Sequence, residues 1–337
     1  MNKSELNFVP CGIEVSSETL LVARGSKAPR EFPNTAAGHQ ALLRFLEQGG
    51  GRVRVCLEAT GRYGLDLALA LHAARLPVMV ANPRAVRHFA SALMERSKTD
   101  PLDARVLAEY AARMPFQSWQ PPSPTVLKLV GVVRRLQALT EMRAAEKNRL
   151  HAASLSEALS GYVRLEIAHH LRTLEHSVQR LTRAAEQFIG DDWALAERYQ
   201  LLQSIPGFGP TSALHVLAEL SLLGADLDVR QWVAAAGLDP RHYSSGSSVH
   251  QKTRISKLGN ARLRRGLYMP ALVAIQHEPH LAAFYRKLLG RGKAKMQALV
   301  AVMRKLLHAI YGMFKHHQTY DGSKIHALTP LPEALCV

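Results

Sequence analysis

Long apolar runs, cysteines and acidic residues are all scarce in this chain. No stretch of about 18 uncharged apolar residues occurs, which argues against a membrane span. The N-terminus lacks the apolar run of a secretory signal, so we expect the chain to stay inside the cell. The three cysteines, Cys11, Cys56 and Cys336, fit no zinc-binding spacing. Cys11 and Cys56 lie in apolar segments, and we interpret them as buried reduced thiols.

The shortage of acidic residues leaves the chain strongly basic. Its 27 Asp and Glu residues face 43 Lys and Arg residues, which gives a net charge of +16. A surface of that charge favours a polyanionic partner, because binding releases counterions from phosphates. Charge alone does not distinguish DNA from RNA, or an enzyme from a packaging protein. The length of 337 residues suggests two domains and a connector.

Strand-like and helix-like patterns alternate over the first 116 residues. Short apolar or alternating runs predict strands at 7–15, 19–24, 30–35, 52–59 and 77–82. Helical spacing predicts helices at 36–48, 64–75 and 100–114, and a further helix begins at Pro83. Three antiparallel strands followed by strand–helix crossovers match the ribonuclease H-like layout, an α/β architecture.

The composition changes after the Pro-rich segment 117–124. Apolar residues then recur at three- and four-residue steps in two runs, 126–136 and 163–188, which predicts paired amphipathic helices in a hairpin or coiled coil. We therefore predict a ribonuclease H-like domain at 1–116, a helical coiled-coil connector at 117–200 and a C-terminal domain at 201–337. We interpret the connector as an oligomerisation element.

The C-terminal domain opens with two predicted helices joined by a Gly/Pro turn at 206–210. This pattern is typical of a helix-hairpin-helix, in which backbone N–H groups of Gly207 and Gly209 face a DNA phosphate. An ordinary turn between helices is the alternative. Further helices are predicted at 229–236, 261–275 and 294–314.

Four acidic residues occupy related positions in the predicted N-terminal layout. Glu14 lies on the first strand and Glu58 ends a central strand, while Asp100 and Asp103 share one face of a helix start. These elements converge on one end of a ribonuclease H-like sheet. Clustered carboxylates suit hard divalent cations such as Mg²⁺ or Mn²⁺, which clamp the oxygens of a phosphodiester. Taken singly, each acid also has a structural interpretation, such as a helix N-cap at Asp100.

A polar Ser/Gly-rich loop is predicted at 236–248, followed by a basic turn at 254–260 that leads into a helix. A serine on such a loop, with cations nearby, can attack a phosphodiester. From composition alone, a surface loop that contacts phosphate or nothing is the better interpretation.

Seven motifs together resemble those of the insertion sequence one-ten family of transposases. In order they are GIEVS (12–16), LEATG (57–61), SKTDPLDA (97–104), IPGFGP (205–210), AGLDP (236–240), SSG (244–246) and RISKLGNARLR (254–264). The resemblance covers nearly the whole chain. It implies an N-terminal DEDD domain with a Holliday-junction-resolvase-like fold and a mostly α C-terminal domain that bears a serine.

The resemblance also implies roles for individual residues. The catalytic and metal-binding acids would be Glu14, Glu58, Asp100 and Asp103, with Mg²⁺ or Mn²⁺ as cofactor. Ser245, directly before Gly246, would be the nucleophile that forms a covalent phosphoserine link to DNA. The expected nucleic-acid contacts are Gly207, Gly209, Arg254, Lys257, Arg262, Arg264 and Arg265.

The family recruits a structured noncoding guide RNA encoded by its own element, and the implied partners are therefore this RNA together with donor and target DNA. We also expect a homo-oligomer, dimer or tetramer, in the bacterial cytoplasm, nucleoid-associated when bound to DNA. The family's first acid is Asp, and Glu14 carries its carboxylate one methylene further out. Ser244 is a neighbouring alternative to Ser245. Two other functions stay open: a metal-dependent junction-resolving nuclease, and a non-catalytic nucleic-acid-binding protein.

Overall fold

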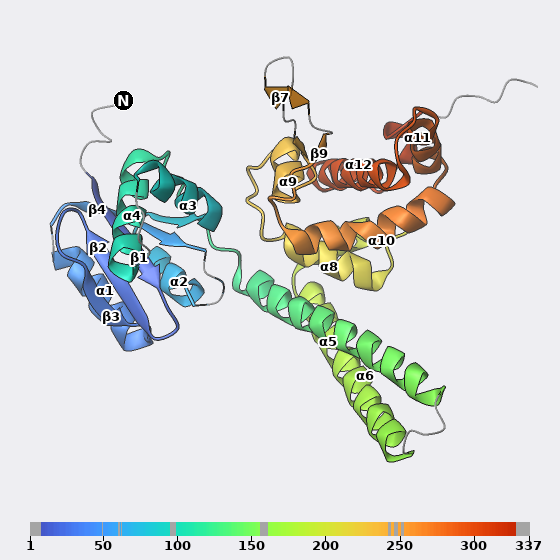
Figure 1. Ribbon diagram of the computed structural model, residues 1–337, viewed down its shortest axis with the longest axis horizontal. Coiled ribbons are helices and arrows are strands. Elements are labelled where there is room, and N and C mark those ends of the chain that lie inside the picture. The colour runs from blue at the N-terminus through green and yellow to red at the C-terminus, as the bar shows by residue number, and fades with distance from the viewer. Residues whose placement is uncertain are drawn as a thin grey trace, which may run out of the picture. The chain divides into compact units, whose positions relative to one another are not determined.

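The computed structural model describes residues 8–48, 50–59, 61, 63–94, 99–155, 161–241, 244–245, 249–250 and 253–327. The chain divides into two compact units, Met1–Pro121 and Pro122–Val337. Figure 1 shows a sheet flanked by helices in the first unit and a helical body with a long helical hairpin in the second. The mixed α/β N-terminal part and the helical C-terminal part are therefore confirmed.

A five-stranded mixed sheet forms the centre of the first unit, in the order β3-β2-β1-β4-β5. The strands are β1 (Phe8–Val15), β2 (Thr19–Arg24), β3 (Arg30–Pro33), β4 (Arg52–Glu58) and β5 (Val78–Ala81). Neighbours β1 and β2 are antiparallel, as are β2 and β3, whereas β4 runs parallel to both β1 and β5. The helices are α1 (Ala36–Gln48), α2 (Leu65–Ala73), α3 (Pro83–Ala92) and α4 (Asp100–Arg113).

The two faces of this sheet are covered by different helices. Side chains that alternate along a strand point to opposite faces. Odd-numbered residues of β1 and β4, such as Ile13 and Val55, pack with apolar residues of α1 and α2. Cys56 on the other face packs with apolar residues of α3 and α4, including Val86 and Leu107. The sheet is therefore the middle layer of three.

Helices α5 (Pro124–Ser154) and α6 (Gly161–Gly190) pair along their length as a helical hairpin, as predicted. The base of the hairpin is part of the core of the second unit, because Val126, Leu129 and Leu136 are buried there together with Ala185 and Ile189. Figure 1 shows the rest of the hairpin extending away from that body.

The helical body of the second unit surrounds a single apolar core. Its helices are α7 (Trp193–Gln203), α8 (Pro210–Leu220), α9 (Val229–Ala235), α10 (Ala261–His277), α11 (Pro279–Gly290) and α12 (Lys295–His316), followed by the short 3₁₀ helix η2 (Gly322–Lys324). In the part of the chain that is described, no helix is long and apolar enough to cross a membrane.

The segment between α9 and α10, predicted as a polar loop and a basic turn, contains two short antiparallel strand pairs. Strand β6 (Pro240–Arg241) pairs with β9 (Arg254–Ile255), and β7 (Ser244–Ser245) pairs with β8 (Val249–His250). Two-residue strands leave no alternation for a sequence pattern to detect. We call these four short strands, β6 to β9, the serine hairpin; β7 projects from the body in Figure 1.

Two further details differ from expectation. The structural role considered for Asp100 is wrong, because the carbonyl oxygen of Thr99 accepts the first helical bonds, from the N–H groups of Leu102 and Asp103. Thr99 is therefore the N-cap, and Asp100 is the first residue of the helix. Helix α11 was not predicted; the buried Glu278 begins it by accepting a hydrogen bond from the Leu281 N–H.

Candidate active site: an acidic sheet edge and a serine hairpin

Glu14 and Glu58 lie side by side at the carboxyl ends of two parallel strands. The register pairs Gly12 with Cys56 and Ile13 with Leu57, and Glu14 and Glu58 are the residues that follow this last pair on their strands. Both glutamates point to the α3/α4 face, because they follow Gly12 and Cys56 by two residues. Both side chains are half-buried.

Helix α4 crosses this face in the direction opposite to β1. A Cβ atom on Gly12 would lie 2.8 Å from the carbonyl carbon of Leu107 and closer still to backbone atoms of Ala104 and Ala108, so the helix rests directly on β1. At the other end of the strands, the Arg54 guanidinium lies over Phe116, which follows α4. The first turn of α4 therefore lies toward the carboxyl ends of β1 and β4.

The first turn of α4 carries Asp100 and Asp103. Four residues of helix span about 6 Å and two residues of strand span about 6.6 Å. Since Ala104 lies over Gly12, these dimensions lead us to expect Asp100 near the level of Glu14 along the strand. Helical side chains also tilt toward the helix N-terminus, which here means toward the strand ends. The backbone thus brings all four acids to one edge, which we call the acidic edge.

The acidic edge offers only carboxylate oxygens, the donors that Mg²⁺ and Mn²⁺ prefer. Within the described ranges, however, no three Asp, Glu, His or Cys side chains lie close enough together to hold a metal ion. The carboxylate donors and their backbone positions thus fit a hard divalent cation. To bind one, the side chains of the four acids would have to move closer together. Burial, and then the charge of Glu58, raise the pKa of the nearby Cys56 thiol to about 12.

The serine hairpin presents Ser245 at its outer pair of strands, where Ser245 is paired with Val249 and Ser244 with His250. Gly246, which follows Ser245, lies outside the described residues.

Two glycines fix the base of the serine hairpin. Gly237 has a φ of 64°, and a Cβ on Gly259 would come within 2.5 Å of the Gly237 nitrogen. Backbone hydrogen bonds join the same two segments, from the Lys257 N–H to the Gly237 oxygen (3.1 Å) and from the Asn260 N–H to the Ala235 oxygen (2.6 Å). Side chains at either glycine would separate the segments, which explains the AGLDP and RISKLGN motifs as one structural unit.

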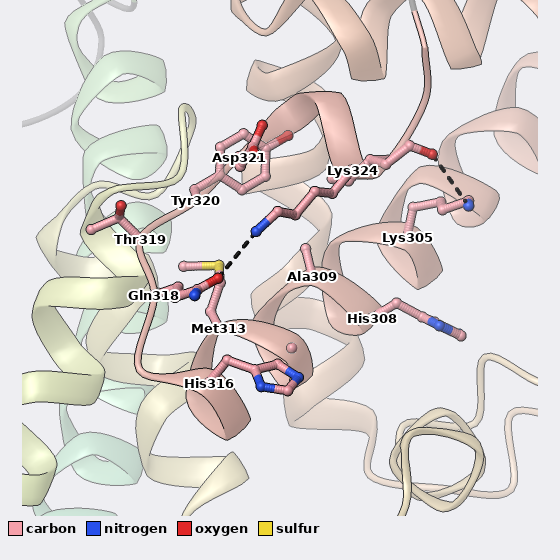
Figure 2. A pocket seen from close by; sticks show the side chains of 12 residues that line it. Lys305, His308, Ala309, Met313, His316, Gln318, Thr319, Tyr320, Asp321 and Lys324 are labelled. Carbon is pink, nitrogen blue, oxygen red and sulfur yellow. Dashed lines mark hydrogen bonds between the residues drawn. The ribbon is translucent and has the colours of Figure 1, made fainter.

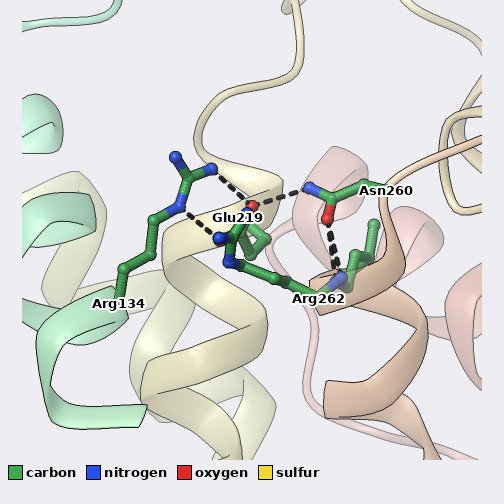
Figure 3. A network of polar contacts seen from close by, with 5 residues as sticks. Arg134, Glu219, Asn260 and Arg262 are labelled. Atoms are coloured by element: carbon green, nitrogen blue, oxygen red, sulfur yellow. Dashed lines mark hydrogen bonds and ion pairs between the residues drawn. The ribbon is translucent and has the colours of Figure 1, made fainter. Parts of the chain in front are cut away.

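A buried acid connects this base to the root of the helical hairpin (Figure 3). Glu219 on α8, whose side chain is 4% exposed, accepts two hydrogen bonds from Arg134 of α5, from Nε (2.8 Å) and Nη2 (2.9 Å). Asn260 donates a third to Glu219 (2.6 Å), and its own oxygen caps α10 at the Arg262 and Leu263 N–H groups. Burial raises the pKa of Glu219, but the bonds from Arg134 and Asn260 outweigh it and lower the pKa below its usual value.

The residues predicted to contact nucleic acid fall into two groups. Arg254, Lys257, Arg262 and Arg265 have exposed side chains near the base of the serine hairpin, and Gly209 is exposed at the start of α8. Two others have a structural explanation. Gly207 has a φ of 104°, and a Cβ there would lie 2.6 Å from the Pro270 oxygen of α10; Arg264 donates to the Ala236 oxygen (2.8 Å).

A separate cavity of about 290 Å³ lies between α12 and residues 318–325 (Figure 2). Lys324 donates to Gln318 (3.1 Å), and Lys305 donates to the Ile325 oxygen (3.5 Å). Lys305 also lies over the Phe284 ring. These contacts hold the segment after α12 against that helix, so the Lys305 side chain is engaged in packing.

An α/β unit with acids at one sheet edge, together with a helical unit that carries a serine hairpin, is the organisation of a transposase or recombinase, an enzyme that acts on DNA. Residues 13–158 match the DEDD transposase model of IS110 type, and residues 199–286 match the transposase IS116/IS110/IS902 family. The chain belongs to this IS110 family of transposases.

Full-length relatives support the assignment. The chain is 31% identical to a pilin gene-inverting protein of Moraxella lacunata and 29% identical to one of Moraxella bovis, in each case over 94% of this chain and 98% of the relative. It is 26% identical to the transposase for insertion sequence element IS1328 of Yersinia enterocolitica, over 59% of this chain and 64% of the relative.

Sequence reasoning missed Arg134 and Glu219. They are 85 residues apart, and no motif includes both. The one available signal was a lone acid in the apolar run ALHVLAEL (213–220), because a charge at a buried helical position requires a partner.

Proposed function

We propose that this enzyme cuts and rejoins DNA through Ser245, with a divalent cation held at the acidic edge of a ribonuclease H-like N-terminal domain. The observations that support the proposal are that Glu14 and Glu58 directly follow the paired residues Ile13 and Leu57 at the ends of β1 and β4, and that α4 packs on β1 at Gly12. A bound Mg²⁺ or Mn²⁺ supplies charge stabilisation to the phosphodiester under attack.

In the proposed step, the Ser245 hydroxyl oxygen forms a bond to a DNA phosphorus and the bond from phosphorus to one bridging sugar oxygen breaks. The hydroxyl proton passes through solvent to the departing sugar oxygen. The phosphoserine ester keeps the bond energy, so the reverse attack by a sugar hydroxyl reseals a strand without ATP. The fixed base of the serine hairpin supports this role, because a nucleophile needs a defined approach.

The proposal further includes a homo-oligomer, dimer or tetramer, and a structured noncoding guide RNA bound beside donor and target DNA. The net charge of +16 supports binding to polyanions such as these nucleic acids. Exposed Arg254, Lys257, Arg262 and Arg265, and a helix-hairpin-helix formed by α7 and α8, would contact phosphates. The relatives named pilin gene-inverting proteins support DNA rearrangement as the outcome.

The experiment is a search for a denaturation-resistant protein–DNA adduct. Purified protein is incubated with a plasmid that carries the DNA flanking its gene, together with RNA transcribed from that DNA, in Mg²⁺ or in EDTA. We expect an adduct in Mg²⁺ that Ser245→Ala abolishes and the matched Ser244→Ala retains. Cleavage that persists in Ser245→Ala without an adduct would instead identify a nuclease that uses water.

A further inference from the structure

A cleft between the root of the helical hairpin and the start of α10 collects basic side chains from both elements. It has a volume of about 380 Å³ and is lined by Arg134, Gln137, Ala138, Glu141, Ala261, Arg262 and Arg265. Arg134 and Gln137 come from α5, and the other arginines come from α10, so the lining joins segments more than 120 residues apart in sequence.

Arg134 is held in this cleft in a fixed orientation. Its Nε and Nη2 atoms both donate to the buried Glu219 carboxylate, and its side chain is nevertheless 35% exposed. The bidentate bond uses one edge of the guanidinium and leaves Nη1 on the other side; Figure 3 shows this nitrogen directed away from Glu219. An arginine fixed in this way loses little side-chain entropy when its remaining N–H groups bind a ligand.

Arg262 approaches the same place from α10. Figure 3 shows its side chain extending back from the helix start toward Arg134. Glu219 and Asn260 set this approach, since Asn260 donates to Glu219 and caps α10 at the Arg262 N–H (2.9 Å). The one acid at the mouth of the cleft, Glu141, pairs with Arg265, and both side chains are more than half exposed. Such an exposed pair contributes little and opens easily.

We propose that this cleft binds a nucleic-acid phosphate through Arg134 and Arg262, and that Glu219 is the positioning residue that aims Arg134. Guanidinium groups match the geometry of phosphate oxygens. The inference rests on the proposed function for its ligand class, because that function supplies DNA and RNA as partners. It adds α5, which no sequence motif marked, to the nucleic-acid surface.

The test must avoid leaving Glu219 buried without a partner, because removal of one member of a buried pair destabilises the fold. The double variant Arg134→Met/Glu219→Gln removes both charges and leaves the net charge at +16 (16 − 1 + 1). The Met side chain fills the space of the arginine stem, and the amide introduced by Glu219→Gln keeps an acceptor for Asn260. Arg135→Gln, at an exposed neighbouring position outside the cleft, is the matched control.

Binding of the full chain is measured by fluorescence anisotropy as a function of salt, with a duplex DNA and a single-stranded RNA of mixed sequence as probes. If the cleft binds a phosphate of duplex DNA, we expect the double variant to reduce the steepness of the plot of log K against log salt by about 0.9 with the DNA probe. If the phosphate belongs to RNA, we expect a reduction of about 0.7 with the RNA probe. In either case binding of that probe should weaken about tenfold. The probe that shows the change identifies the source. Arg135→Gln should change neither slope by as much.

Glu219→Gln alone separates positioning from charge. It raises the net charge from +16 to +17 (16 + 1), which by itself tightens binding to a polyanion. If Glu219 aims Arg134, the variant binds more weakly than the parent despite the added charge. Unchanged slopes for both probes in a folded double variant, or tighter binding by Glu219→Gln, would overturn the inference. If the parent protein forms no Ser245 adduct while the double variant shows the expected change of slope, only the proposed function would be refuted.

Discussion

Replacing Gly12 with alanine should misplace the acids of α4 without altering any acid. The new Cβ would lie 2.8 Å from the Leu107 carbonyl carbon and closer to the Ala104 oxygen. Ordinary contacts between carbon atoms are about 3.5–4.0 Å, so α4 must recede from β1 by about 1 Å. Overpacking of this kind costs about 1–3 kcal/mol of unfolding free energy. A displacement of 1 Å at a catalytic centre lowers the rate by about 10²-fold.

The matched control is Gly131→Ala on α5, where a Cβ would meet nothing within 4 Å. An exposed helical glycine replaced by alanine gains about 0.5–1 kcal/mol. Calorimetry of the full chain measures stability, and adduct yield in Mg²⁺ measures activity. We expect Gly12→Ala to lower both and Gly131→Ala to lower neither. Full activity and an unchanged melting temperature in Gly12→Ala would refute the packing of α4 on β1 and the acidic edge that depends on it.

Three further outcomes follow from the described contacts. Glu58→Gln should reduce metal-dependent DNA cleavage by roughly 10²–10³-fold, while Glu14→Asp, which keeps the carboxylate, should retain it; plasmid nicking in Mg²⁺ compares them. Burial lowers the pKa of His215 below its ordinary value of 6.5. As the pH drops below 6.5, the unfolded chain therefore binds a proton at His215 before the folded chain does. The unfolding free energy then falls by up to about 1.4 kcal/mol per pH unit. In urea titrations at pH 7.0 and 5.5, His215→Leu should lose less stability than the parent, and an equal loss would count against this assignment. Burial raises the pKa of Cys11 and Cys56 to about 12, so a disulfide reagent at pH 8 should label neither until the chain is unfolded, as read by peptide mass spectrometry.

The N-terminal architecture was largely predictable because its strands are long enough to show a period. Predicted and observed bounds agree within a residue or two for β1, β2 and β4, and the predicted helix 36–48 coincides with α1. Placement of Glu14 beside Glu58 follows once two parallel strands are paired, since register then fixes the face of every residue. The contribution of α4 required the structure, because the Gly12 contact with its backbone has no sequence signature.

The second unit was less predictable for a related reason. Paired strands of two residues, such as Ser244–Ser245, carry no periodicity, so the serine hairpin had the composition of a loop. The contact of Gly237 with Gly259 and the Arg134–Glu219 pair are long-range interactions of single residues. Patterns along the chain report local structure, and they do not report which distant residues meet.

The central claim, that acids of β1, β4 and α4 hold one cation, can be measured without DNA. Fe²⁺ is substituted for Mg²⁺, and the hydroxyl radicals it generates with ascorbate and peroxide cut the backbone near the metal. We expect cuts around residues 14, 58 and 100–103 in a single reaction, suppressed by excess Mg²⁺ and lost in Glu58→Gln. Cuts confined to one of these stretches, or unaffected by Glu58→Gln, would contradict the claim.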